Sequence, residues 1–129
     1  MRKLVIAGGL IAAAQILGSL GALAGPWEDG MAAYSRGDYA PALQLFRSLA
    51  RQGNAKAQAA IGAMYRKGQG VAKSSAHAFM WLSLAAARGD AVARTEMTEM
   101  SRTMSAAELA QAREMMQACE ASDYRNCEY

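Results

Sequence analysis

An internal repeat is the feature of this sequence that most restricts its fold. The segment GNAKAQ (residues 53–58) recurs as GDAVAR (89–94), 36 residues later, and GDYAPAL (37–43) is a weaker third copy. A period of about 34–40 residues with two helices per unit is typical of stacked helical hairpins, in which each unit buries its apolar face against the next. The repeat therefore predicts an all-α fold, a short α-solenoid.

A glycine followed by Asp or Asn opens each copy and predicts where two helices meet. Glycine can adopt the left-handed conformation that ends a helix, and the Asp or Asn after it can cap the next helix by accepting backbone N–H bonds. Ser74 and Ser105 fit two further caps, and SAAE at 105–108 fits a capping box. Short connections then predict three antiparallel hairpins. The predicted helices are 27–36, 39–52, 55–67, 75–88, 91–103 and 106–120.

Gly62 lies inside a predicted helix, where glycine costs about 1 kcal/mol relative to Ala. We expect it to let the helix at 75–88 approach closely, through a face that carries Ala78, Trp81 and Ala85 at i, i+3 and i+7. Tyr65 and Trp81 would fill the space around these small residues.

Gly68 and Gly70 follow the same helix, and we expect them to end it and to turn the chain so that Val71 packs against the core. A phosphate-binding loop is not indicated, because no strand is expected before this Gly-x-Gly and no G-K-[ST] follows it.

The first 24 residues have the pattern of a secretory signal peptide. Arg2 and Lys3 precede an apolar run at 4–20, and ALA at 22–24 is a cleavage signal. We expect cleavage after Ala24, a mature domain at 25–129, a periplasmic or secreted location, and no stable membrane association once the signal is removed. The alternative is an uncleaved anchor, since residues 4–24 are long enough to span a bilayer.

Charge gives little guidance about a partner. Without Arg2 and Lys3, 12 basic residues face 11 acidic ones, so nucleic-acid binding is not indicated. Residues 36–94 carry nine basic and two acidic side chains, whereas residues 95–129 carry three and seven. This asymmetry either favours an anionic partner or reflects a solvated surface.

Cys119 and Cys127 are the only cysteines. An even pair in an exported chain predicts a disulfide, here one that holds the C-terminal tail at 119–129. A metal site built from two cysteines would need further ligands, so no metal and no cofactor are predicted.

Methionines recur in the last third of the chain. Met97, Met100 and Met104 are spaced i, i+3 and i+7, and Met115 and Met116 follow in the next predicted helix. Three interpretations stay open: a core between these helices, an adaptable apolar contact surface, or a thioether site for Cu(I).

No catalytic residues are predicted. His77 is the only histidine, it falls beside the predicted cap at Ser74, and no Ser-His-Asp set can be assigned around it.

The run from residue 57 to 93 resembles a Sel-one-like repeat (SLR), a relative of the tetratricopeptide repeat. The best repeat spans 54–89, residues 37–58 resemble the second helix of a preceding unit, and residues 90–120 resemble a capping hairpin that lacks the Gly-x-Gly loop. The matching residues are Ala57, Ala60, Gly62, Met64, Tyr65, Gly68, Gly70, Val71, Ala78, Trp81, Ala85, Ala86, Gly89, Asp90 and Ala93.

This resemblance implies a non-catalytic adaptor that holds a protein or peptide on a concave helical surface. Tyr34, Lys56 and Arg66 are the candidate contact residues, and the open ends of a solenoid also allow self-association. The alternative for such residues is packing between repeats. Other members of the candidate surface are Met31, Ala59, Ala63 and Arg94.

ACEASDYRNCEY (118–129) resembles the joint between repeats in a cysteine-rich SLR branch linked to penicillin binding and β-lactam hydrolysis. This chain has one cysteine pair and no S-x-x-K motif. Cell-wall or β-lactam binding is therefore an alternative function, and an accessory subunit anchored by an uncleaved N-terminal helix is another.

Overall fold

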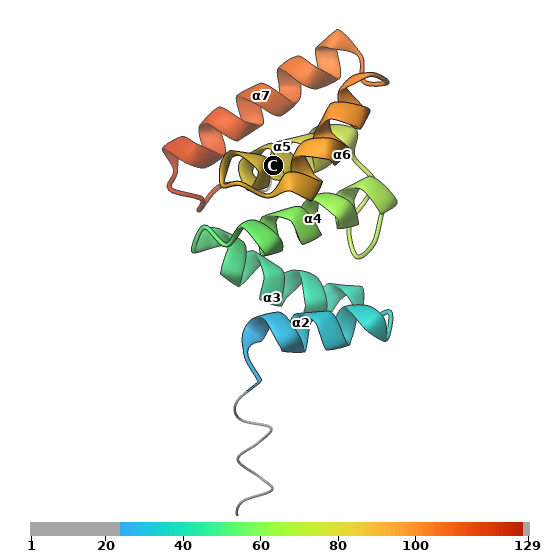
Figure 1. Cartoon of the computed structure of the whole chain (residues 1–129), viewed down its shortest axis with the longest axis vertical. Helices are drawn as coiled ribbons and strands as arrows, with labels where there is room; N and C mark the ends of the chain where they lie inside the picture. Colours follow the sequence, from blue (N-terminus) through green and yellow to red (C-terminus); the bar gives the residue numbers. More distant parts are fainter. Residues whose placement is uncertain (1–23, 128–129) are drawn as a thin grey trace, which may run out of the picture.

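The computed structural model describes residues 24–127, and within them the protein is entirely helical, as predicted. The helices follow one another along the long axis of the molecule, from α2 to α7 (Figure 1). The expected signal peptide lies outside the described residues, apart from Ala24. The helices are α2 Pro26–Ser35, α3 Tyr39–Arg51, α4 Ala55–Lys67, α5 Ser75–Ala87, α6 Ala91–Ser101 and α7 Ala106–Ala121.

Four of the predicted caps form. The Ala57 N–H donates to Asn54 Oδ1 (3.0 Å) and the Ala93 N–H to Asp90 Oδ1 (2.8 Å). Ser74 caps α5 in the same way, and Ser105 forms the predicted capping box with Glu108. Each cap satisfies a backbone donor that the first turn of a helix leaves free.

The expected cap at Asp38 is wrong. Its side chain makes no cap bond to α3, because the carboxylate instead accepts a hydrogen bond from Arg36 Nε at 3.2 Å. Gly37 still adopts the left-handed conformation between the two helices, with φ of +81°. Gly37 therefore sets the conformation of the turn, whereas the Asp38 carboxylate binds Arg36 and not the backbone of α3.

Helices α4 and α5 form the tightest pair, and Gly62 explains how. A Cβ atom at position 62 would lie 2.8 Å from Leu82 Cγ and 3.2 Å from the Ala78 carbonyl oxygen. Because α5 occupies the space of the missing side chain, the two helices approach closely. The predicted role of Gly62 is confirmed, although Leu82 fills the gap that Tyr65 and Trp81 were expected to fill.

The first pair, α2 and α3, also approaches closely at a glycine, Gly30, which sequence reasoning overlooked. A Cβ atom on Gly30 would lie 2.6 Å from Phe46 Cε1, so the Phe46 ring rests directly on the α2 backbone. Trp27 packs beside it, with the two ring centroids 5.2 Å apart. The pairs α2–α3 and α4–α5 thus both place a glycine of the first helix against a large side chain of the second. We call such pairs closed.

The loop after α4 has the expected form. Gly68 caps the helix in the left-handed conformation, and Gly70 repeats that conformation, each with φ of +71°. The Ser74 N–H donates to the Tyr65 carbonyl (3.1 Å), which closes the loop, and Val71 packs against the core.

Helix α5 is the centre of the fold. Residues 76 and 78–86 are all buried, as expected for a helix that is apolar on every side. It packs against α4, α6 and α7. Its buried hydroxyl, Ser83 Oγ, donates to the Phe79 carbonyl (2.7 Å), whereas the buried Trp81 Nε1 has no hydrogen-bond partner among the described residues.

The last pair, α6 and α7, is arranged differently. Both helices pack on α5, but their contact with each other is marginal. Figure 1 shows α7 crossing the end of the molecule while α6 runs in front of α5. The capping hairpin expected at 90–120 therefore has both of its helices but is open between them.

Candidate functional site: the groove between α6 and α7

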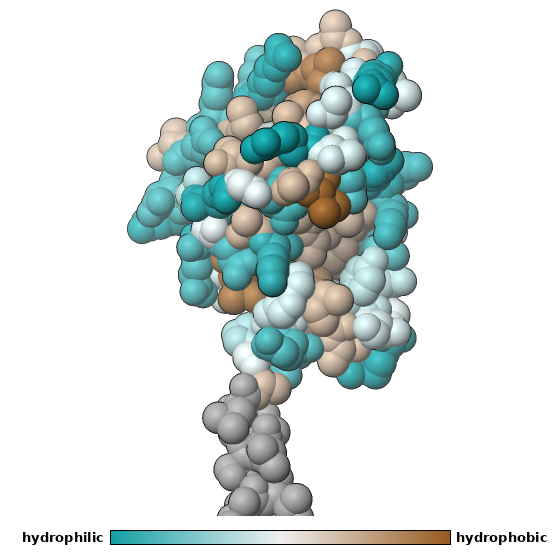
Figure 2. Space-filling view, viewed as in Figure 1, coloured by the Kyte–Doolittle hydropathy of each residue, from teal (hydrophilic) through white to brown (hydrophobic). Residues whose placement is uncertain are grey.

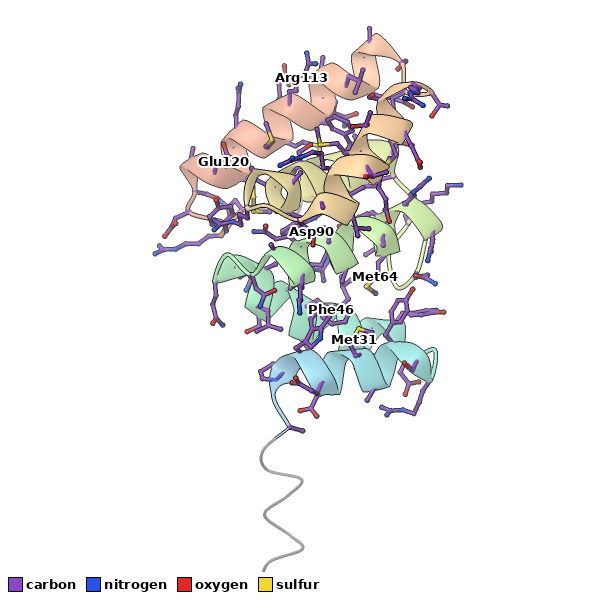
Figure 3. All side chains as sticks on the ribbon, viewed as in Figure 1. Met31, Phe46, Met64, Asp90, Arg113 and Glu120 are labelled. Atoms are coloured by element: carbon purple, nitrogen blue, oxygen red, sulfur yellow. A yellow bond between two sulfur atoms is a disulfide. The ribbon has the colours of Figure 1, made fainter. Side chains whose placement is uncertain are left out.

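An open groove of about 540 Å³ separates α6 from α7, with α5 as its floor. Three other surface hollows have volumes of about 320, 180 and 300 Å³. Figure 3 shows Arg113 and Glu120, two residues of its α7 wall. The floor is Phe79, Ser83, Ala86 and Ala87, and the walls are Arg94, Met97, Arg113, Met116 and Glu120.

The internal repeat allows the open groove to be compared with the closed α4–α5 pair. One period after Gly62 lies Thr98, whose β-branched side chain donates a hydrogen bond to the Arg94 carbonyl (2.8 Å). The position at which α4 carries a glycine packed against Leu82 therefore carries an exposed side chain in α6. Helix α7 packs on α5, and its contact with α6 is marginal.

The same comparison shows what the groove exposes. Gln58 and Ile61 of α4 are fully buried, and Gln58 Nε2 donates to the Ala50 carbonyl of α3 (3.3 Å). One period later, Arg94 and Met97 face the groove. A surface that is core in one repeat is therefore accessible in the next.

Two arginines stand on opposite walls of the groove, Arg94 on α6 and Arg113 on α7. Within residues 24–127 neither guanidinium forms an ion pair. Glu120 is the acidic residue of the lining. In contrast, Arg66 on α4 pairs with Glu96 of α6 at 3.5 Å.

The methionines of this region differ in burial. Met100 and Met115 are buried and belong to the core, whereas Met97 and Met116 are half-buried and line the groove. Met97 is held at the floor by Ser83 Oγ, 3.5 Å from its sulfur. The core interpretation therefore holds for Met100 and Met115, whereas Met97 and Met116 stay partly accessible.

The C-terminal tail holds α7 in place. Cys119 and Cys127 are joined by a disulfide, with their Cα atoms 4.5 Å apart, and both are buried. Asp123 and Tyr124 adopt left-handed conformations that turn the chain back after α7. Tyr124 and Cys127 of the tail line the same small hollow as Trp81 of α5.

A cation–π contact strengthens the same joint. The Arg88 guanidinium, at the end of α5, lies 4.7 Å from the centroid of the Tyr124 ring. Its other side rests on Gly53, where a Cβ atom would lie 2.9 Å from Arg88 Nη1. Arg88 thereby links the tail to the turn at Gly53, between α3 and α4.

The candidate surface residues Tyr34, Lys56 and Arg66 do not meet in one site. Tyr34 is half-buried, and its hydroxyl donates to Gln69 Oε1 at 2.7 Å. Lys56 is exposed, and Arg66 is engaged by Glu96.

A smaller hollow of about 180 Å³ brings Tyr34 together with Met31 and Ala63 of the candidate surface, beside Phe46 and Ala60. Figure 3 shows Met31 and Phe46 next to each other at this end of the molecule. On the face drawn in Figure 2, apolar and weakly polar side chains gather in the middle while hydrophilic ones line the margins.

His77 contacts the cap of its own helix. Ser74 Oγ lies 2.8 Å from His77 Nδ1 and also accepts the His77 backbone N–H, and the imidazole stacks on Tyr65 with a centroid distance of 4.7 Å. The Ser–His proximity thus has a structural explanation in capping and ring stacking.

The disulfide is evidence about the compartment. Disulfides persist in oxidising compartments and are rare in reducing ones, so the Cys119–Cys127 bridge points to an oxidising environment. Residues 24–127 contain no helix that is long and apolar enough to cross a membrane. The same residues hold no cluster of three His, Cys, Asp or Glu side chains placed to ligate a metal ion.

No protein-family model matches the chain, and no curated protein matches its sequence. The resemblance to the SLR family therefore rests on the residues quoted for it.

Sequence reasoning missed most of the groove. Arg94 was a candidate contact residue and Met97 part of the methionine pattern, but Arg113 and Glu120 drew no attention. One signal was present: Arg113, Met116 and Glu120 are spaced i, i+3 and i+7 and so share one face of α7. That face reads as an ordinary half-polar helix until the position of α7 is known.

Proposed function

We propose that this chain is an exported, non-catalytic helical-repeat adaptor of the SLR type, which binds a protein or peptide partner. The observation that carries the proposal is the open groove over α5. It is lined by buried Phe79 and by half-buried Met97 and Met116, between two arginines that have no ion pair within residues 24–127. An apolar hollow with a few convergent polar groups is the usual form of a binding site.

Two further observations support export. The disulfide favours an oxidising compartment, and the N-terminal residues have the pattern of a cleavable signal. The intact mass of the protein purified from cells tests this part. Loss of residues 1–24 supports export with cleavage, whereas a full-length mass supports the anchored accessory subunit.

Photo-crosslinking in cells tests the adaptor function. A benzoylphenylalanine at position 116 would face the groove, and the same residue at position 117 is the matched control, because Gln117 is exposed and does not line it. We expect one protein or peptide adduct from position 116, identified by mass spectrometry, and none from position 117.

Other outcomes contradict the proposal in distinct ways. Absence of an adduct at position 116, or the same adduct at both positions, argues against a partner in the groove. Covalent labelling of the purified protein by a fluorescent penicillin, or recovery of cell-wall fragments, favours the wall-binding alternative. An adduct of twice the chain mass favours self-association.

A further inference from the structure

We infer that the groove between α6 and α7 binds an amphipathic helix that carries acidic residues beside its apolar face. The inference rests on the proposed adaptor function and adds the chemistry of the partner. Three features of the described residues carry it: the shape of the groove, its charge and its apolar lining.

The shape of the groove matches a helix. Its two walls and its floor are themselves helices, and the equivalent part of the preceding repeat is filled. There, Ile61 is fully buried and a helix packs directly over Gly62. Met97, one period after Ile61, borders the open groove. A helix of a partner would complete the packing that α7 leaves unfinished, the helix-in-groove mode of recognition.

The charge of the groove selects the partner. Arg94 and Arg113 face it from opposite walls, and neither has an ion-pair partner within residues 24–127. Carboxylates on a docked helix would pair with the two guanidiniums, since the planar arginine side chain suits carboxylate recognition. Only Glu120 opposes this preference within the lining.

The apolar lining supplies contact area. Phe79 and the alanines of α5 form a fixed floor, whereas Met97 and Met116 are unbranched and half-buried. Methionine adapts its shape to different partners, so the walls can close around leucine-like side chains. An acidic helix with apolar residues at i, i+3, i+4 and i+7 meets both requirements.

A pair of synthetic peptides tests the inference. Each is a fluorescein-labelled amphipathic helix of about fifteen residues, long enough to form a helix on binding. Both carry leucines at i, i+3, i+4 and i+7, and the flanking positions are glutamate in one peptide and lysine in the other. Affinity for the oxidised protein is measured by fluorescence anisotropy. We expect the glutamate peptide to bind about tenfold more tightly, through two exposed ion pairs and the loss of repulsion.

Charge reversal locates the site. In the Arg94→Glu/Arg113→Glu protein we expect the preference to invert in favour of the lysine peptide. The matched control is Lys56→Glu/Lys67→Glu, two exposed residues of α4 outside the groove, which we expect to retain the original preference. Circular dichroism verifies that each variant is folded. If the double reversal fails to fold, Arg94→Gln/Arg113→Gln should abolish the preference without inverting it.

Every other outcome overturns the inference. The groove does not select acidic helices if neither peptide binds, if both bind equally, or if the preference survives charge reversal. A preference lost in the α4 control moves the site to the α4 surface that carries Lys56 and Lys67. If a groove adduct still forms in cells, the adaptor function stands with a different partner chemistry, whereas failure of both experiments overturns both proposals.

Discussion

The two consecutive repeats of this molecule contrast a closed helix pair with an open one. In α4–α5, Gly62 lets α5 rest on the α4 backbone, and Ile61 and Gln58 are buried. In α6–α7, the equivalent of Gly62 is Thr98, the helices barely touch, and the equivalents of the buried pair border a groove. The difference teaches that a repeat can keep its helices and its caps whether or not its two helices pack against each other.

The open pair keeps its shape because α7 is held from outside. It packs on α5, and the disulfide and the Arg88–Tyr124 contact hold its C-terminal end. The closed pair depends on packing between its own helices, whereas the open pair depends on the disulfide and the Arg88–Tyr124 contact. The predictions below address each half of this contrast.

The largest difference is expected at one pair of equivalent positions. Ile61→Ala should lower the free energy of unfolding by about 4 kcal/mol, since it removes a fully buried side chain and leaves a cavity. Met97→Ala should cost about 1 kcal/mol, because solvent already reaches this side chain. Urea denaturation followed by circular dichroism measures both. Equal losses would mean that Met97 is as well packed as Ile61.

Exchanging the key residues between the repeats is the next test. Gly62→Thr should destabilise the protein by about 3 kcal/mol, because its side chain would collide with Leu82 and with the Ala78 carbonyl. Thr98→Gly should cost about 0.5 kcal/mol, the difference in helix propensity alone. The same denaturation assay applies. A Gly62→Thr variant as stable as Thr98→Gly would remove glycine from the explanation.

Loss of the Cys119–Cys127 disulfide should affect the stability of α7 alone. Replacing Cys119 and Cys127 by alanine opens a loop of this length at a cost of about 2.5 kcal/mol. Native-state hydrogen exchange should then show faster exchange in α7 and unchanged protection in α4 and α5. Uniform acceleration across all helices would show that the tail supports the whole fold and not only the open pair.

The smallest expected effect distinguishes Asn54, which caps α4, from Asp38, which makes no cap bond. Asn54→Ala should cost about 1 kcal/mol, since its side chain satisfies the Ala57 N–H. Asp38→Ala should cost only about 0.3 kcal/mol, because Asp38 makes an exposed pair with Arg36 and no cap bond. Thermal denaturation resolves the two variants. Equal losses would indicate that Asp38 caps α3 in solution.

Much of this fold was predictable from local signals. The glycines that end helices and the residues that cap the next ones act within one or two turns, so they predicted the helix bounds closely, and Gly62 indicated its neighbouring helix. Asp38 failed because two local partners competed for one carboxylate. In contrast, the position of α7 depends on long-range contacts with α5 and on the tail. No short pattern in the sequence records it.

The candidate site was harder to predict for the same reason. Tyr34, Lys56 and Arg66 were chosen as outward positions of first helices, but Tyr34 and Arg66 contact neighbouring repeats. The groove arises where α6 and α7 fail to pack, and its lining comes from three helices. Arg94 and Met97 were noticed separately, and only the arrangement of the helices joins them to Arg113.

Methionine oxidation tests the open groove most directly. Dilute hydrogen peroxide, followed by peptide mass spectrometry, reports the rate at each methionine of the oxidised protein. We expect Met97 and Met116 to react at rates close to that of exposed Met31, and about tenfold faster than fully buried Met64 and Met80. Protection of Met97 and Met116 to the level of Met64 would show that α6 and α7 close together in solution, which would contradict the account.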